Sequence, residues 1–201
     1  MHYERSELET LETCPWCGGE ELQPWGDPTS VFDAAICASC RLIFIRTRLN
    51  KNGMQRYYAS YLSNAHQADI ELNKKRDLMY RIDFDFIRQF APPRRVLDVG
   101  CSGGYFLNVF AEHGCNCRGV EFGEEAAVQA QEKFPVQFGD FPDLCFSERF
   151  DLVVFRGVVE HVPEPRRYLD KAVELLSENG VVFITATPNA DAVCCDLFKE
   201  Q

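Results

Sequence analysis

The stretch of sequence that decides the fold is residues 96–105, Val-Leu-Asp-Val-Gly-Cys-Ser-Gly-Gly-Tyr. Its first four residues predict a buried strand, and the pattern from Tyr105 onward predicts a helix. A strand that runs through glycines into a helix lets a ligand approach the backbone at the carboxyl end of that strand. The dinucleotide fingerprint G-x-G-x-x-G is not met, because Ser102 stands at the second glycine position and Tyr105 at the third. The sequence therefore argues against a pyrophosphate ligand.

Strand-like runs alternate with helical patterns on the C-terminal side of this turn. We expect strands at 96–99, 118–122, 136–138, 152–155 and 181–185, with helices at 105–113, 124–133 and 166–176. Strands that alternate with helices form βαβ units with right-handed crossovers and a parallel sheet. The predicted fold class is α/β, with a doubly wound Rossmann-like sheet.

Composition and charge narrow the class of protein further. The chain has 201 residues, of which 46% are hydrophobic and 26% charged, and its net charge is -10. This is globular composition, and an acidic surface disfavours nonspecific binding to nucleic acid or anionic membranes. The acidic start of the chain does not resemble a signal peptide, so we expect a cytoplasmic protein. Its organisation is predicted as 1–50, a small cysteine-containing module; 51–93, a helical linker or lid; and 94–201, the α/β core.

Four of the ten cysteines form two C-x-x-C pairs in the N-terminal module. Thiolates at this spacing can close a tetrahedron around Zn²⁺. A thioredoxin-like redox motif and a structural disulfide are the alternatives, and two matched pairs in a turn-rich zone favour zinc. The predicted structural zinc ligands are Cys14, Cys17, Cys37 and Cys40.

A run of basic residues follows the second cysteine pair. Residues 41–56 contain five basic side chains and no acidic one. One interpretation is a patch that attracts an anionic substrate or carrier. The alternative is a solvated face, which is the commoner role of such runs. The residues concerned are Arg41, Arg46, Arg48, Lys51 and Arg56.

Acidic residues lie in or directly after the first three predicted core strands. Glu121 ends the second strand, where an acid accepts the ribose hydroxyls of an adenosine. Asp140 follows the third strand and is placed for an adenine amino group, with Phe122 and Phe141 as candidate ring contacts. Asp98 can hold an ammonium group, directly or through water. S-Adenosylmethionine, which joins adenine, ribose and an amino acid without phosphates, matches this set.

With these motifs in order, the sequence resembles the class I S-adenosylmethionine-dependent methyltransferases. The resemblance rests on VLDVGCSGGYFL, RGVEF, FGDF, FDLVVFRGVVEHVPEP and LLSENGVVFITATPN. The N-terminal part is similar to a subgroup with a zinc-ribbon module, which includes bacterial sugar methyltransferases. The cofactor-binding residues that follow from motif and resemblance together are Asp98, Gly100, Cys101, Ser102, Gly103, Gly104, Glu121, Phe122, Asp140, Phe141 and Arg156.

The sequence departs from the family pattern at three places. Ser102 replaces a glycine of the turn, which is tolerable if φ there is negative. Arg156 follows the fourth strand, where it would crowd the methionine end of the cofactor or bind an acidic substrate. The chain also ends before the two further strands of the family's sheet, so we expect a fragment with the fifth strand as an open edge.

Methyl transfer is an in-line displacement, so positioning supplies much of the acceleration. His161 is the candidate general base, because imidazole titrates near neutrality. A similar Glu-His pair occurs in ubiquinone-pathway O-methyltransferases, some of which use a divalent ion, and a purely local role for Glu160 and His161 at a helix start is the third possibility. The tyrosines Tyr57, Tyr58 and Tyr61 either cover the cofactor as a lid or pack the linker on the core.

The function expected is methylation of a small-molecule acceptor, such as a sugar or a biosynthetic intermediate. Two rivals stay open at this point. One is a non-catalytic protein that binds S-adenosylmethionine or S-adenosylhomocysteine and docks a partner through the zinc ribbon. The other is a methyltransferase of a macromolecule, although the acidic charge argues against RNA.

Overall fold

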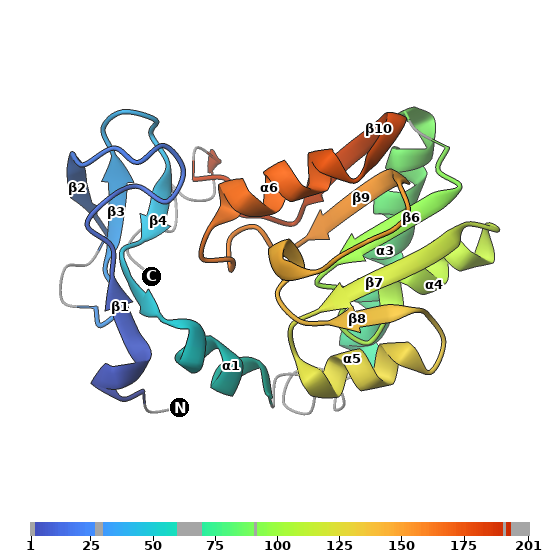
Figure 1. Ribbon diagram of the computed structural model, residues 1–201, viewed down its shortest axis with the longest axis horizontal. Coiled ribbons are helices and arrows are strands. Elements are labelled where there is room, and N and C mark those ends of the chain that lie inside the picture. Colours follow the sequence, from blue (N-terminus) through green and yellow to red (C-terminus); the bar gives the residue numbers. More distant parts are fainter. Residues whose placement is uncertain (1–2, 27–29, 60–69, 91, 191, 194–201) are drawn as a thin grey trace.

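A computed structural model describes residues 3–26, 30–59, 70–90, 92–190 and 192–193 of the chain (Figure 1). In this part of the chain, no helix combines the length and apolar character that crossing a membrane requires. The C-terminal α/β core and the N-terminal β-rich module lie at opposite ends of the long axis, with α1 between them.

The core is built on a five-stranded parallel sheet of order β10-β9-β6-β7-β8. The core begins at the central strand β6 (Arg95–Val99), adds β7 and β8 on one side of it, and then adds β9 and β10 on the other side. The crevice above β6 is therefore a topological switch point. Ligands of open α/β sheets bind at the carboxyl ends of the strands at such points. The strands are β6 (Arg95–Val99), β7 (Asn116–Glu121), β8 (Val136–Phe138), β9 (Phe150–Arg156) and β10 (Leu176–Thr185).

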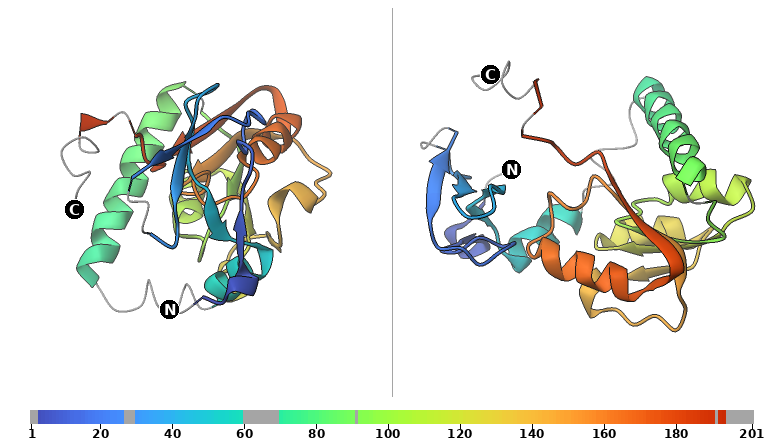
Figure 2. Two further views of the ribbon diagram at one scale, coloured as in Figure 1. Left: turned by 90° about the vertical axis from the view of Figure 1, so that its left-hand side faces the viewer. Right: turned by 90° about the horizontal axis from the view of Figure 1, so that it is seen from above.

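Successive residues of the core strands point to opposite faces of the sheet and pack into two apolar layers, one on each face. Val96, Leu152 and Val154 pack against α3, α4 and α5, whereas Leu97 and Val153 pack on the opposite face with α6. All five are fully buried, as period-two patterning in a two-sided sheet requires. Figure 2 shows α6 on the face opposite to α4 and α5. The helices are α3 (Ile70–Phe90), α4 (Tyr105–Glu112), α5 (Glu124–Gln131) and α6 (Pro165–Glu174), with the 3-10 turn η2 (Phe141–Asp143).

The N-terminal module consists of two small antiparallel sheets. One pairs β1 (Leu8–Thr10) with β5 (Thr47–Leu49), and the other has the order β2-β3-β4, from Leu22–Trp25, Ala34–Cys37 and Ile43–Ile45. A 3-10 turn, η1 (Arg5–Glu7), precedes β1, and α1 (Lys51–Ala59) follows β5. Gly53 of α1 packs so closely on η1 that a Cβ there would lie 2.7 Å from the carbonyl oxygen of Glu7.

The α/β class, the parallel sheet and the predicted core elements are confirmed. β10 begins at Leu176 rather than at residue 181, with an irregular register between Leu176 and Val181. The expected helical zone contains α1 and α3. Glu160 and His161 lie in a turn before α6 rather than at a helix start.

Candidate active site

A cavity of about 810 Å³ opens at the carboxyl ends of β6, β7 and β9. This volume is within the range of small-molecule sites. Its walls come from both parts of the molecule, because β1, β5 and α1 face the core across it. Core side chains on the wall include Asp98, Ser102, Glu121, Phe122, Asp140, Arg156 and His161, and the N-terminal ones include Glu9, Leu11, Arg48, Leu49, Met54, Tyr57 and Tyr58.

Glu121 ends β7 and is 7% exposed. Its Oε1 accepts backbone N–H bonds from Phe122 at 2.8 Å and Gly123 at 2.7 Å, and Oε2 accepts one from Ser102 at 2.7 Å. Burial raises the pKa of this carboxyl, and the three backbone donors oppose the rise. The amides fix the carboxylate at the cavity wall, and Oε2 retains acceptor capacity for a hydroxyl donor.

Asp98 lies on β6 and is 2% exposed. Burial, together with the negative charge of Glu121, raises its pKa to about 8, and the positive charge of Arg156 opposes this. Within the described residues, these two acids are the buried charged side chains. A buried carboxylate is costly without a cationic partner, so the position of Asp98 suits an ammonium group.

The turn after β6 brings backbone close to the cavity. Gly100 has a φ of +76°, and a Cβ there would lie 2.6 Å from Val158 Cγ2. Ser102 has a φ of +49°, so the condition under which a serine is easily tolerated here, a negative φ, is not met. The left-handed conformation aims the Ser102 N–H at Glu121, and this bond compensates for the strain. Among the described groups, the buried Ser102 hydroxyl finds no hydrogen-bond partner.

The remaining residues of the turn serve its packing. Cys101 is buried, burial raises the pKa of its thiol, and its sulfur would be 2.5 Å from a Cβ at Gly119. Gly104 precedes α4 with a φ of +80°, and a Cβ at Gly103 would lie 2.9 Å from the Gln129 amide. Neither Gly103 nor Gly104 lines the cavity, whereas Cys101 does.

Asp140 and Phe141, which follow β8, both line the cavity. Tyr168 on α6 donates a hydrogen bond to Asp140 Oδ1, which leaves Oδ2 with acceptor capacity. Phe141 is 1% exposed, and its ring packs in the core against Phe155 and Tyr168. Phe141 also lines the cavity, so it remains a candidate for contact with a ligand ring. Phe122 lines the cavity and meets the Tyr58 ring edge-on at 6.1 Å.

Arg156, at the end of β9, is held by α3. Its Nε donates to Asp83 Oδ2 at 2.8 Å, and its guanidinium lies 4.6 Å from the Tyr80 ring centroid. The charge of Arg156 is therefore neutralised, which counts against capture of an acidic substrate by this residue. Sequence reasoning missed Tyr80 and Asp83, because nothing local indicates which face of α3 meets the sheet.

His161 lies on the cavity wall with its side chain 58% exposed. Its Nε2 is 3.9 Å from Glu160 Oε1, and Glu160 accepts a hydrogen bond from Thr187 at 2.9 Å. The arrangement leaves the imidazole accessible to an acceptor in the cavity. Tyr57 and Tyr58 of α1 also line it, and Tyr61 lies outside the described residues, as do Cys194 and Cys195.

The four cysteines of the paired motifs converge at one point, with all sulfurs within 4.8 Å of one another. Cys14 Sγ lies 3.6 Å from Cys40 Sγ, and Cys17 Sγ lies 3.6 Å from Cys37 Sγ. A disulfide is about 2.05 Å long, so these pairs are not bonded. A tetrahedron with Zn–S bonds of about 2.3 Å has edges of about 3.8 Å, close to the observed separations. Backbone N–H groups, that of Cys40 foremost, lower the pKa of Cys37 to about 7.

Acidic residues from the start of the chain pair with three members of the basic run. Arg46 lies 3.2 Å from Glu12, Arg48 2.7 Å from Glu9, and Arg56 2.6 Å from Glu7. The run therefore forms local ion pairs that tie the N-terminal segment to β5 and α1. This pairing weakens its interpretation as a patch for an anionic substrate.

Comparison with known proteins agrees with this arrangement. A family model described as a methyltransferase domain matches residues 66–197, about two thirds of the chain. The chain belongs to this methyltransferase family. The match covers β6 to β10 and every cavity residue of the core.

Two relatives of the methyltransferase domain, from different organisms, have the same name. The ubiquinone biosynthesis O-methyltransferase of Coxiella burnetii is 32% identical over 100 residues, 46% of this chain and 43% of that protein. That of Actinobacillus pleuropneumoniae is 30% identical over 124 residues, with 54% and 53% covered. The chain thus spans about half the length of the curated relatives it matches.

Solved structures of methyltransferases share the fold. Plantazolicin methyltransferase BpumL, in complex with a monoazolic desmethylPZN analog and SAH, has a TM-score of 0.55 at 19% identity, covering 75% of this chain and 59% of that one. SAM-bound CalS10, an amino pentose methyltransferase from Micromonospora echinaspora, has a TM-score of 0.50 at 22% identity, with 59% and 56% covered.

Proposed function

We propose that this methyltransferase-family chain binds S-adenosylmethionine and transfers its methyl group to a small-molecule acceptor. The observation that carries the proposal is the pair of buried carboxylates, Asp98 and Glu121, on one cavity wall beside a glycine turn. Buried acids with raised pKa values in a cleft are typical of functional sites. SAM- and SAH-bound structures of the same fold support the choice of ligand.

Each end of the ligand has a matching group. Glu121 Oε2 would accept a ribose hydroxyl, since the three backbone amides already orient the carboxylate. Asp98 would hold the amino group, whose positive charge relieves the burial of this acid. Asp140 Oδ2 and the Phe122 ring would border the adenine. Gly100 has no side chain, so the ligand could approach the backbone of the turn closely.

S-Adenosylmethionine supplies an activated methyl group on a sulfonium centre. The chain contributes binding and orientation, which account for most of what such a displacement requires. His161 is proposed to accept the proton of an acceptor hydroxyl, because its ring faces the cavity and is accessible. Replacement of a general base by glutamine lowers the rate by about 10²- to 10⁴-fold.

The acceptor class is proposed from the relatives and from the cavity. The curated relatives are named as O-methyltransferases of ubiquinone biosynthesis, and one structural neighbour as an amino pentose methyltransferase. The N-terminal part of the cavity wall adds apolar side chains to polar ones, with Leu11, Leu49 and Met54 beside Glu9 and Arg48. We therefore propose a hydroxyl-bearing biosynthetic intermediate as the acceptor.

The cysteine cluster is proposed to bind one structural Zn²⁺. Four sulfur ligands close the coordination sphere, which leaves no open position for catalysis. The metal would hold the module together, because a zone of this size buries too little core to fold alone. None of the eight described cysteines forms a disulfide, which suits a reducing compartment, and we propose a cytoplasmic location.

The test is a methyl-transfer assay with labelled S-adenosylmethionine and a panel of phenols and amino sugars. We expect S-adenosylhomocysteine and a labelled product with at least one acceptor, and none with Glu121→Gln. His161→Gln should bind S-adenosylmethionine normally and turn over slowly. Tight binding with no transfer to any acceptor would favour the non-catalytic binder instead.

A further inference from the structure

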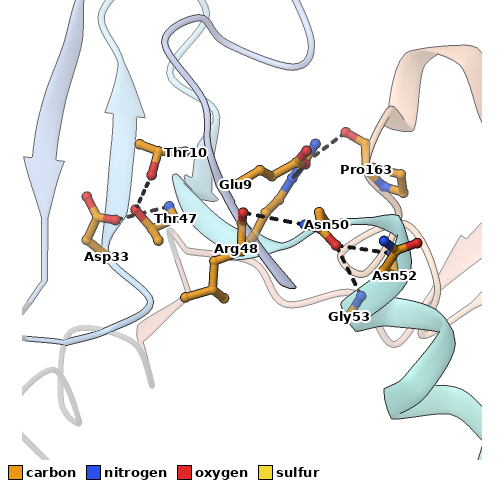
Figure 3. Close-up of polar contacts among 10 residues, drawn as sticks. Glu9, Thr10, Asp33, Thr47, Arg48, Asn50, Asn52, Gly53 and Pro163 are labelled. Atoms are coloured by element: carbon orange, nitrogen blue, oxygen red, sulfur yellow. Dashed lines mark hydrogen bonds and ion pairs between the residues drawn. The ribbon is translucent and has the colours of Figure 1, made fainter. Parts of the chain in front are cut away.

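A side chain of the N-terminal module bonds to the turn that carries His161. Arg48 lies on β5, and its Nη1 donates a hydrogen bond of 2.8 Å to the carbonyl oxygen of Pro163. The two residues are 115 positions apart in the chain. Figure 3 shows the guanidinium between Glu9 and Pro163. Arg48, Pro163 and His161 all line the same cavity.

Glu9 fixes the direction of this guanidinium. It lies opposite Arg48 in the β1–β5 register, and its Oε1 accepts a bond from Arg48 Nε at 2.7 Å. The Arg48 side chain is only 19% exposed. With Nε on a carboxylate and Nη1 on a carbonyl, the rigid guanidinium fork can satisfy both partners at once. Its charge is neutralised by Glu9, so the geometry favours positioning over capture of an anion.

The strand that presents Arg48 is itself well anchored. Thr47 N donates to Asp33 Oδ1 at 3.0 Å, and the Thr10 and Thr47 hydroxyls are 3.1 Å apart. On the other side, Asn50 caps α1 by accepting bonds from the N–H groups of Asn52 and Gly53, both at 3.1 Å. Figure 3 shows these contacts on both sides of Arg48.

The turn beyond β9 needs such a support. Its start is fixed by the bond from Gly157 N to Thr185 O at 2.8 Å, and His161 N donates to Val158 O at 2.8 Å. The segment then passes through Pro163 and Pro165, which have no N–H to donate. Arg48 supplies the donor for the Pro163 carbonyl between these points.

We propose that Arg48 is a positioning residue that holds the His161 turn in place at the cavity. The N-terminal module thus contributes to the reaction in two ways: it fixes this turn, and it lines part of the cavity. The catalytic consequence rests on the function proposed above, whereas the effect on the turn does not.

The test is backbone hydrogen–deuterium exchange of the full chain, with attention to the amides within residues 158–164, Pro163 having none, and above all to that of His161, which donates to Val158 O. Loss of a hydrogen bond from a charged donor predicts about tenfold faster exchange of these amides in Arg48→Ala, with the strands of the core unchanged. Arg48→Lys should rescue little, because a single ammonium does not reproduce the fork. Arg46→Ala is the matched control, since the Arg46 side chain bonds to Leu11 and Glu12 and has no bond to the turn among the described residues, and it should leave the turn unchanged.

Two further measurements separate positioning from general stability. The imidazole signals of His161 in NMR spectra, assigned with His161→Gln, should shift in Arg48→Ala and stay in place in Arg46→Ala. Affinity for S-adenosylmethionine should change less than twofold in both variants, because neither arginine is among the residues proposed to bind this ligand. Unchanged exchange of 158–164 and an unshifted His161 signal in Arg48→Ala would overturn the proposal. If these change as expected but no acceptor is ever methylated, the positioning stands and the proposed function fails.

Discussion

At the scale of single residues, the site depends on two acids that the fold buries at a cost. Asp98 and Glu121 are 2% and 7% exposed, and the charge of Glu121 disfavours ionisation of Asp98. Glu121 is compensated by three backbone amides, whereas Asp98 has no such donors among the described residues. Buried groups that lower the stability of the fold are common at sites where ligand binding requires them.

Asp98→Asn should change how stability depends on pH. Because the folded-state pKa is raised to about 8 from 3.8, the folded protein keeps a proton that the unfolded chain releases. Asp98 therefore lowers the free energy of unfolding as pH rises from about 4 to about 8. Relative to the wild type, the ligand-free variant should gain at least about 1.4 kcal/mol between pH 5 and pH 8, the equivalent of one pKa unit. Urea unfolding at both pH values measures this.

Asp85→Asn provides the control for this experiment. Asp85 is exposed on α3 and pairs with Arg88 at 3.0 Å. Its replacement should shift stability by the same small amount at both pH values. A pH-independent difference between wild type and Asp98→Asn would contradict the raised pKa of Asp98.

At the scale of elements, the β6–α4 turn is where backbone conformation and ligand approach are linked. Gly100→Ala places a side chain at a φ of +76° and 2.6 Å from Val158 Cγ2. We expect a loss of more than the roughly 1–2 kcal/mol that left-handed backbone costs an alanine, together with loss of S-adenosylmethionine binding. Thermal unfolding and calorimetry measure the two effects.

Gly114→Ala is the matched variant for the turn. Gly114 also has a positive φ, of +80°, but a Cβ there would have no atom within 4 Å. It should lose about 1–2 kcal/mol and bind S-adenosylmethionine as the wild type does. Equal losses in the two variants would show that contact with Val158 is unimportant.

The same scale shows what sequence reasoning can reach. Runs of Val, Leu and Phe and the glycines between them predicted β6 to β9 and the helices that follow, because these signals are local. The positive φ of Ser102 was missed, since its compensating bond goes to Glu121 on another strand. The partner of Arg156 was missed for the same reason, as Asp83 is 73 residues away. The contact of the Phe141 ring with Tyr168 of α6 is also a long-range feature that no local pattern indicates.

At the scale of the whole molecule, the N-terminal module and the core form one cavity. The pairing of β1 with β5 was not foreseen, because three-residue strands carry almost no periodic signal. It brings Glu7, Glu9 and Glu12 to the basic run, so an apparent cationic patch becomes a set of ion pairs.

The cysteine cluster gives a prediction at this scale. Protein purified without chelator should contain about one zinc per chain, and Cys37→Ser should contain almost none and unfold at a lower temperature. Cys145→Ser is the control, because Cys145 is an exposed thiol outside the cluster. Elemental analysis measures the zinc content, and thermal unfolding measures the loss of stability. Wild-type protein without zinc would refute the metal site.

The central claim is that Glu121 and its surroundings bind S-adenosylmethionine, and isothermal titration calorimetry with this ligand tests it most directly. The wild type should bind at one site, and Glu132→Ala, whose exposed side chain lies off the cavity, should bind equally well. Loss of the hydrogen bonds to a charged acceptor predicts at least about tenfold weaker binding by Glu121→Ala. Equal affinity of Glu121→Ala and the wild type would contradict the account.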